Sequence, residues 1–408
     1  MKISTGTSAA NAALQAFNKY LKENRQRSTT MAAAVMVGVA GLVALQFSGA
    51  GGFANALGNE DGQGFVFFGS KIFLDDSEQE ESEATEPTVA TEATAKLATV
   101  ARSGFVGRNG KDLTLDGKEF KFVGYNNFAL TGCAHGAMSA ADMDKYFASL
   151  RPTSVTRTWA FKPLGLDGVK NAVASAERNN QKLILALGDG AQYCNDTGYN
   201  AGFYQSGYKG AYLNWVNQVV AAVKDSPAVM AYETMNEPCH TGAGGVTKEI
   251  MRNFFDGTAA AIKANDKNHL VFTGSLAEYD CGGALSDFAY VHGGANIDGG
   301  SLHEYDYLSV GQKGVSSHWN AVRPALHGID KVAYVGEVGV GPEGSCLADA
   351  EMASAHKAKL DGYMNAGASG VLVWGFDDSA NKACGLYSGR QITYGSATAA
   401  MFKNFTIQ

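Results

Sequence analysis

Hydrophobic and polar positions change their arrangement along the 408-residue chain, and the change comes near residue 104. From there onward, short apolar runs alternate with amphipathic stretches. Eight runs have the length and composition of strands: FKFVGYN, SVTRTWAF, KLILALGD, AVMAYETMNE, HLVFTGS, DGGSLHEYD, KVAYVGEVG and GVLVWGFDD. Between most of them lie stretches that predict helices, at 139–150, 167–180, 207–224, 247–265 and 349–366.

Repeated strand and helix units predict an α/β fold for residues 104–408, a (β/α)₈ TIM barrel. The alternative is a doubly wound parallel sheet, which would normally carry a glycine-rich phosphate loop after its first strand. The segment VGYNNFALTG is not such a loop. Before the first run, FVGRNGKDLTLDGKEF predicts hairpin strands with turns at Asn109-Gly110 and Asp116-Gly117, which could form a floor to the barrel.

The amino-terminal part of the chain has a different pattern. Residues 1–30 are basic, and residues 31–47 are uncharged and apolar, near the shortest length that spans a bilayer core of about 30 Å. The basic flank predicts a cytoplasmic amino end and translocation of everything after residue 47, whether the segment is a retained single-pass anchor or a cleaved signal. We therefore expect a secreted or extracytoplasmic protein, with membrane contact through residues 31–47. The alternative is a buried alanine-rich helix.

Residues 48–103 form the predicted linker to the barrel. The stretch DDSEQEESEATEPTVATEATA is acidic and has few residues to bury, which predicts a disordered, self-repelling spacer. An exposed charged helix over SEQEESEA is the alternative, and Pro87 and the scattered threonines disfavour a long one.

Composition and charge exclude several functions. The hydrophobic content of 45% is ordinary for a globular protein, and the net charge of −7 provides no basic surface for nucleic acid. All six cysteines follow residue 104, and no two form a CxxC pair, which disfavours a zinc or thioredoxin-type site. We expect neither a metal nor a cofactor.

An even number of cysteines behind a translocation signal predicts disulfides, with buried free thiols as the alternative. If the barrel order is right, cysteines in neighbouring loops should pair. The expected pairs are Cys239 with Cys281, Cys346 with Cys384, and Cys133 with Cys194, the last of which skips a strand.

Polar residues gather at the carboxyl ends of the predicted strands: Asn126, Asn127, Arg157, Asp189, Asn236, Glu237, His303, Tyr305, Glu337, Trp374 and Asp377. In a barrel these ends converge on the face where active sites lie. Glu237 and Glu337, on opposing strands, suggest acid/base and nucleophilic work, the pairing of carboxylates needed to cleave a glycosidic bond.

The series RTWAF, NEP, HEY, GEVG and VWGF, in that order, resembles glycoside hydrolase family 5, a family of retaining (β/α)₈ enzymes. The resemblance covers residues 104–408. It implies the following roles: Glu237 as acid/base, Glu337 as nucleophile, Asn236 at the sugar 2-hydroxyl, Arg157 and Tyr305 on the nucleophile, His303 positioning the acid/base, and Trp374 as sugar platform. For Trp159, sugar stacking and barrel packing are both open.

Retention sets two further expectations for the carboxylates. Glu237 needs a raised pKa to stay protonated, whereas Glu337 needs donors such as Arg157 and Tyr305 to stay ionised. The two carboxyl groups should lie about 5–5.5 Å apart, rather than the roughly 6.5–9.5 Å of an inverting enzyme.

The RTWAF and NNFAL stretches resemble the mannanase-like branches of the family, and aromatic residues near strand ends suit stacking on a β-1,4-linked chain: Trp159, Tyr193, Tyr279 and Trp374. The resemblance therefore implies an endo-β-1,4-mannanase, which we expect to be monomeric, acting on β-linked polysaccharide. One alternative is a cellulase or other β-glucanase. Another is a non-catalytic, membrane-tethered glycan-binding protein, although binding alone would not require both carboxylates.

Overall fold

The computed structural model describes residues 104–407, except 134–135, 241–242, 277–284, 306–313, 341–346, 379–383, 386–388 and 391. The predictions for residues 1–30, 31–47 and 48–103 therefore lie outside the described residues. Within the described part of the chain, every helix is too short or too polar to cross a bilayer.

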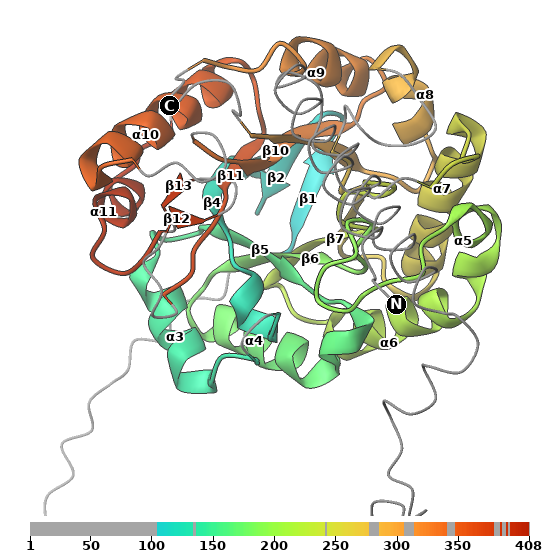
Figure 1. Ribbon diagram of the computed structural model, residues 1–408, viewed down its shortest axis with the longest axis horizontal. Helices are drawn as coiled ribbons and strands as arrows, with labels where there is room; N and C mark the ends of the chain where they lie inside the picture. The colour runs from blue at the N-terminus through green and yellow to red at the C-terminus, as the bar shows by residue number, and fades with distance from the viewer. Residues whose placement is uncertain are drawn as a thin grey trace, which may run out of the picture. The chain divides into compact units, whose positions relative to one another are not determined.

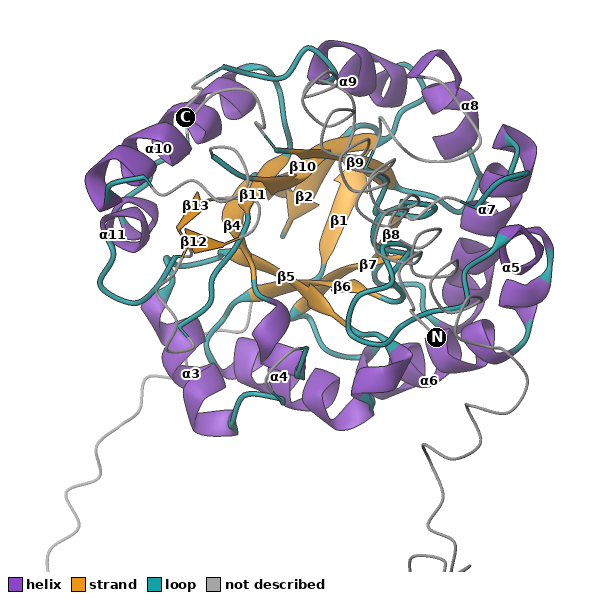
Figure 2. Ribbon diagram, in the orientation of Figure 1, coloured by secondary structure: helices purple, strands orange, loops and turns teal. Residues whose placement is uncertain are grey.

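Eight parallel strands close into a barrel, and the predicted (β/α)₈ fold is confirmed. Each of the eight apolar runs supplies one strand. The ring is visible in Figure 2, with the strands inside and the helices outside. Around it the strands are β4 (Phe122–Asn126), β5 (Val155–Trp159), β6 (Lys182–Ala186), β7 (Val229–Glu233), β8 (Leu270–Phe272), β9 (Gly299–Glu304), β10 (Val332–Val338) and β11 (Gly370–Val373).

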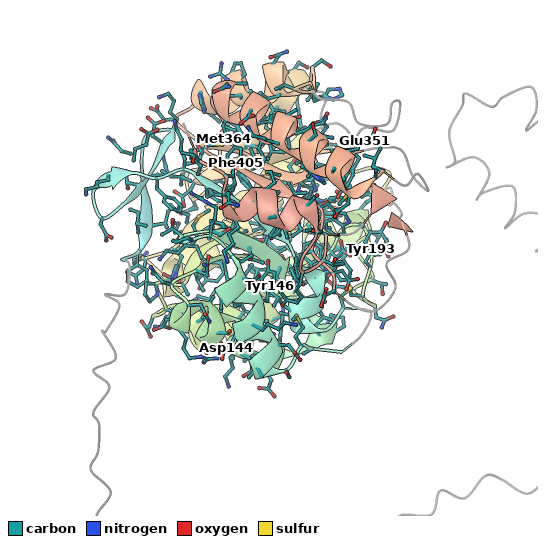
Figure 3. The ribbon with its side chains drawn as sticks, turned by 90° about the vertical axis from the view of Figure 1, so that its left-hand side faces the viewer. Asp144, Tyr146, Tyr193, Glu351, Met364 and Phe405 are labelled. Atoms are coloured by element: carbon teal, nitrogen blue, oxygen red, sulfur yellow. A yellow bond between two sulfur atoms is a disulfide. The ribbon has the colours of Figure 1, made fainter. Side chains whose placement is uncertain are left out.

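Helices cover the outside of the barrel, as Figure 1 shows. The five helical stretches expected from the sequence correspond to α3 (Ala140–Ser149), α4 (Leu166–Arg178), α6 (Ala211–Val223), α7 (Lys248–Asn265) and α10 (Asp349–Asn365). Four more complete the ring: α5 (Ala201–Gln205), α8 (Phe288–His292), α9 (Trp319–His327) and α11 (Ala397–Lys403). On the flank seen in Figure 3, α10, α11 and α3 are neighbours. Tyr146 of α3 ties this layer to the barrel through a 2.9 Å hydrogen bond to Thr156 of β5.

The predicted hairpin strands are also present, as β1 (Val106–Asn109), β2 (Asp112–Leu115) and β3 (Lys118–Glu119) in an antiparallel sheet. Gly110 and Gly117 both take positive φ in its turns, where glycine is favoured. Val106, Leu113 and Phe120 pack on residues at the beginnings of the barrel strands, including Phe122 and Val332. The hairpin therefore closes the amino-terminal end of the barrel and leaves the opposite end for the site.

One predicted disulfide can be followed in the structure. Cys133 and Cys194 are bonded, with their Cα atoms 5.3 Å apart. The pair packs with Trp159 and Phe161 above the end of β5, so the loops after β4 and β6 meet over the strand between them. Cys239 is also disulfide-bonded. Its predicted pairing with Cys281, and that of Cys346 with Cys384, stay predictions because Cys281 and Cys346 lie outside the described residues.

Candidate active site

A buried arginine organises the carboxyl-terminal end of the barrel. Arg157, at the third position of β5, points inward and has no exposed surface. Its Nε donates to both carboxylate oxygens of Glu233 at 2.9 and 2.8 Å, and its Nη1 donates to Glu337 at 2.7 Å. The guanidinium also donates to the side-chain oxygens of Asn126, at 3.0 Å, and Asn236, at 2.6 Å. One side chain therefore links β4, β5, β7 and β10.

Burial alone would lower the pKa of Arg157, but Glu233 and Glu337 outweigh it and raise that pKa. The guanidinium is consequently a permanent charge at the centre of the site. A buried charge is tolerable only when it is paired and its donors are satisfied, as they are here. Glu233, whose second partner is the Tyr334 hydroxyl, balances the arginine from inside the barrel.

The segment that carries Glu237 is held by close backbone contacts. Asn236 N–H donates to Gly188 O at 2.7 Å, and Glu237 N–H donates to Gly274 O at 3.0 Å. A Cβ on Gly190 would lie 2.2 Å from the carbonyl oxygen of Glu237, so only glycine allows this approach. Glu237 itself has φ of +41°, a strained conformation for a residue with a side chain. The neighbouring loops therefore determine where this carboxylate points.

Glu237, His303 and Glu337 form one compact group. His303 Nδ1 lies 2.8 Å from an oxygen of Glu237 and 3.6 Å from an oxygen of Glu337. The ligand atoms of all three side chains lie within 4.8 Å of one another. Glu337 also accepts hydrogen bonds from Arg157 and from the Tyr305 hydroxyl. The closeness of the two carboxylates favours a retaining glycosidase over an inverting one.

The protonation preferences of this group differ from the expectation. Burial opposes ionisation of Glu237, but the hydrogen bond and charge of His303 outweigh it and lower the pKa of Glu237. Burial is the largest effect at Glu337, and together with the charge of Glu237 it raises the pKa of Glu337 despite His303, Arg157 and Tyr305. The predicted donors are present, but the expected directions were wrong because His303 lies against Glu237 and the second carboxylate is close by.

Asn236 is fixed by a second buried carboxylate. Its Nδ2 donates to Asp189 at 2.8 Å, while its oxygen faces Arg157, so both ends of the amide are oriented. Asp189 also accepts the backbone N–H groups of Ala191 and Tyr193. Burial raises the pKa of Asp189 to about 7. Asp189 therefore lies behind Asn236 as a positioning residue.

Aromatic side chains cluster beside Arg157 at the carboxyl-terminal end of the barrel. Trp159 is only 4% exposed, stacks on Phe161 with ring centroids 5.0 Å apart, and lies under the Arg157 guanidinium. Trp374 is partly exposed and stacks on Phe128 at 5.8 Å. Barrel packing accounts for Trp159, while Trp374 has surface free for a ligand. Tyr193 is 48% exposed on the loop after β6, and Tyr279 lies outside the described residues.

The structure brings together Arg157, Asn236, Glu237, His303, Tyr305 and Glu337, six of the residues expected from the sequence. Asn127 instead accepts the N–H of Ala129 and caps the short helix at Phe128–Thr131. Two participants were missed, Glu233 and His240, the latter 3.6 Å from Glu237. Glu233 is the inward-facing residue four positions before Glu237. The presence of a carboxylate inside an otherwise apolar strand could have identified it from the sequence.

The Glu237, His303 and Glu337 group also has the proximity required of metal ligands. Its surroundings oppose a cation, because the permanently charged Arg157 already occupies one oxygen of Glu337. The Tyr305 hydroxyl occupies the other oxygen, and His303 Nδ1 faces Glu237. Proton transfer and nucleophilic attack are the chemistry that this arrangement supports best.

A family model and several known proteins match the sequence of this chain. The family model described as "GH family 5 beta-mannosidase-like" matches residues 165–307. "Probable mannan endo-1,4-beta-mannosidase A-2" of Aspergillus terreus is 26% identical, over 72% of this chain and 83% of its own. "Mannan endo-1,4-beta-mannosidase 1" of Solanum lycopersicum is 27% identical, over 68% of this chain and 85% of its own.

Solved structures support the fold. The endo-1,4-beta-mannanase from Rhizomucor miehei superposes with a TM-score of 0.59 at 20% identity, covering 73% of this chain and 97% of its own. The endo-beta-1,4-mannanase from Thermotoga petrophila gives a TM-score of 0.53 at 18% identity, covering 71% of this chain and 76% of its own. The family match inside the barrel, together with the paired carboxylates after β7 and in β10, confirms the resemblance to glycoside hydrolase family 5.

Proposed function

We propose that this protein is a retaining endo-β-1,4-mannanase. The observation that carries the proposal is the spacing of the two carboxylates, whose nearest oxygens lie within 4.8 Å. This proximity favours the roughly 5–5.5 Å separation of carboxyl groups in a retaining enzyme over the roughly 6.5–9.5 Å of an inverting one, in which the wider gap admits a water molecule. The names of the relatives, all mannan endo-1,4-beta-mannosidases, support mannan as the substrate.

In the first step, the Glu337 carboxylate attacks the anomeric carbon while Glu237 gives its proton to the leaving glycosidic oxygen. One C–O bond forms and one breaks, leaving a glycosyl ester on Glu337. Arg157 and Tyr305, both bonded to Glu337, fix the direction of attack. In the second step, Glu237 accepts a proton from water, the water oxygen attacks the anomeric carbon, and Glu337 leaves as a carboxylate.

Glu237 receives from His303 the proton that it later donates, along the 2.8 Å hydrogen bond between their side chains. In the free protein the proton lies on His303. Contact with the imidazole favours ionised Glu237 and lowers its pKa. Burial opposes protonation of His303, but the charge of Glu337 and the hydrogen bond to Glu237 outweigh burial and raise the pKa of His303. Transfer along this hydrogen bond gives protonated Glu237 and neutral His303 without changing the total charge. The acid is therefore the pair rather than Glu237 alone.

Substrate positioning follows from the groups around the pair. Asn236, held between Asp189 and Arg157, has one amide hydrogen left to donate to the 2-hydroxyl of the sugar. Trp374 offers a flat apolar surface to the sugar ring, the arrangement in which aromatic side chains bind carbohydrate faces.

The test is the release of products from polysaccharides by the purified protein. We expect β-1,4-mannan to be cleaved into a ladder of oligosaccharides, with cellulose and laminarin cleaved far more slowly. Release of mannose alone would indicate an exo-acting enzyme. Preferred cleavage of cellulose would replace the mannanase proposal with a β-glucanase, and binding without cleavage of any polymer would leave a glycan-binding protein.

We also propose that residues 1–47 direct the barrel, as a monomer, to the extracytoplasmic side. The basic flank and the apolar run of residues 31–47 support this placement. Protease added outside intact cells should degrade a retained, anchored barrel, and cleaved protein should collect in the medium. A barrel found only in the cytoplasm would overturn the proposal.

A further inference from the structure

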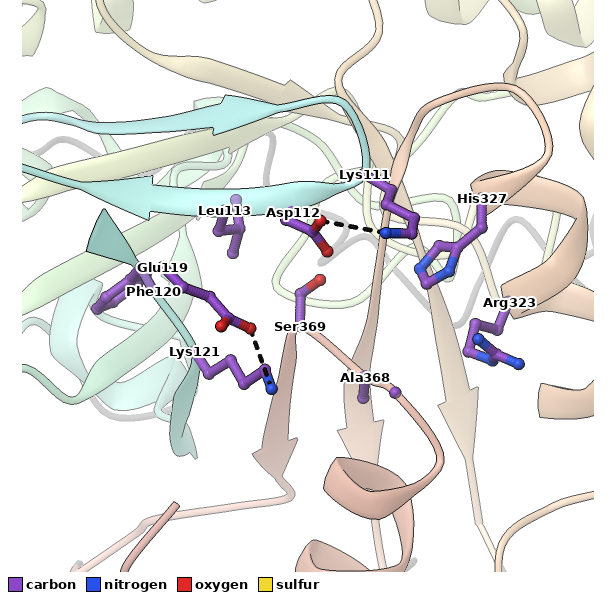
Figure 4. A pocket seen from close by; sticks show the side chains of 11 residues that line it. Lys111, Asp112, Leu113, Glu119, Phe120, Lys121, Arg323, His327, Ala368 and Ser369 are labelled. Atoms are coloured by element: carbon purple, nitrogen blue, oxygen red, sulfur yellow. Dashed lines mark hydrogen bonds and ion pairs between the residues drawn. The ribbon is translucent and has the colours of Figure 1, made fainter. Parts of the chain in front are cut away.

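A cavity of about 220 Å³ lies at the closed end of the barrel, away from the carboxylates. Its walls come from the β1–β3 hairpin, from α9 and from the turn before β11, and Figure 4 shows the side chains that line it. Leu113 and Phe120 provide apolar surface, and the other side chains are mostly charged. The proposed glycosidase chemistry uses none of these residues.

Two of the cations in this cavity already have partners. Lys111 pairs with Asp112 and Lys121 pairs with Glu119, each at 3.1 Å. Arg323 differs, because no carboxylate or carbonyl among the described residues accepts from its guanidinium. Figure 4 shows Arg323 beside His327 and Lys111, on the side of the cavity opposite the Glu119 and Lys121 pair. The cavity therefore carries one positive charge that the described protein does not balance.

His327 adds a second unsatisfied group. Its Nε2 is buried and has no hydrogen-bond partner among the described residues. Burial lowers the pKa of His327, the charges of Arg323 and Lys111 lower it further, and Asp112 opposes them. A buried polar atom without a partner is unfavourable, and so is a partly desolvated cation without a counter-charge. A ligand that accepts hydrogen bonds and carries negative charge would satisfy both.

We propose that this cavity binds a small organic oxyanion, a carboxylate or a phosphate monoester, between Arg323 and His327. The planar guanidinium can donate two parallel hydrogen bonds to such a group. The anion would raise the pKa of His327, so that the imidazole takes up a proton and donates it in a hydrogen bond to the ligand. Leu113 and Phe120 would contact the organic part of the ligand. The volume is ample, since a water molecule occupies about 30 Å³.

The test is a calorimetric titration of the full-length protein with acetate, succinate, inorganic phosphate and glycerol phosphate, at pH 6 and pH 8. We expect binding that strengthens at the lower pH and takes up a proton. Arg323→Gln should weaken it at least tenfold, as expected for a lost charged hydrogen bond. Comparing the carboxylates with the phosphates assigns the ligand class. Arg151→Gln is the matched control, because Arg151 is another partly buried arginine without a carboxylate partner among the described residues.

The NMR titration of His327 in the unsubstituted protein provides an independent measurement that does not depend on a variant folding. Its pKa should rise when the preferred anion is present, and hydrolysis of polysaccharide should be the same in Arg323→Gln as in the parent. The proposal is overturned if no anion binds at millimolar concentration, if the pKa of His327 does not move, or if Arg151→Gln weakens binding as much as Arg323→Gln.

Discussion

Replacing Tyr305 by phenylalanine isolates one hydrogen bond to the proposed nucleophile. The Tyr305 hydroxyl donates to one oxygen of Glu337, and Arg157 donates to the other. Tyr305→Phe removes the first donor and leaves the arginine in place. Because the hydroxyl favours the ionised form of Glu337, its loss must raise the pKa of Glu337 above the already raised value.

The size of the effect follows from the bond that is lost. A hydrogen bond to a charged group contributes about 1.5–3 kcal/mol, which corresponds to roughly one to two pKa units. Only ionised Glu337 attacks, and its population falls tenfold for each unit by which the pH lies below the pKa. The variant should therefore lose about 10- to 100-fold in kcat/KM on the acidic side of its pH profile, and most of this loss should be recovered at higher pH.

The measurement is kcat/KM for a soluble mannooligosaccharide as a function of pH. The acidic limb should move to higher pH in Tyr305→Phe. Tyr199→Phe is the control, because it removes a hydroxyl that donates to Asp196 at 2.6 Å rather than to Glu337, and its acidic limb should not move. An unchanged acidic limb in Tyr305→Phe would show that Glu337 is not the group whose ionisation starts the reaction.

Three further predictions concern the acid, the disulfide and the domain boundary. Glu237→Ala should lose activity on polysaccharide but retain glycosylation of substrates with good leaving groups, measured with aryl glycosides; equal losses on both would argue against an acid role. Replacing Cys133 and Cys194 by serine opens a loop with a sequence separation of 61 residues and should lower the free energy of unfolding by about 4 kcal/mol in denaturant titration; an unchanged midpoint would contradict this. A chain beginning at Arg102 should fold and keep its rate on soluble oligosaccharides, and inactivity under oxidising conditions would show that the domain boundary was placed wrongly.

The barrel was predictable because its strands have a strong local signal. Parallel strands covered by helices are buried on both faces, so each reads as a short, nearly continuous apolar run. Helix α9 lacked a comparable signal, since Pro324 lies inside it and a proline usually marks the end of a helix. Helices α5, α8 and α11 are too short to show a periodic pattern.

The sequence predicted which residues lie in the site because residues at the ends of the barrel strands meet on one face. The barrel topology brings Arg157, Asn236, Glu237 and Glu337 to one face, and that follows from sequence position alone. Which side chain contacts which does not follow: Arg157 makes its bidentate contact with Glu233, a residue hidden within a strand run. The pKa directions depend on distances of 2.8 and 3.6 Å from His303, which sequence spacing cannot supply.

The most direct test of the double-displacement mechanism is to identify the residue that carries the covalent intermediate. The protein is incubated with 2-deoxy-2-fluoro-β-mannosyl fluoride, whose good leaving group lets the ester form and whose fluorine slows its hydrolysis, and its peptides are then analysed by mass spectrometry. We predict one added sugar, on the peptide and side chain of Glu337, with no label in Glu337→Ala. Label on Glu237, or none at all while mannan is still cleaved, would contradict the assignment of Glu337 as nucleophile.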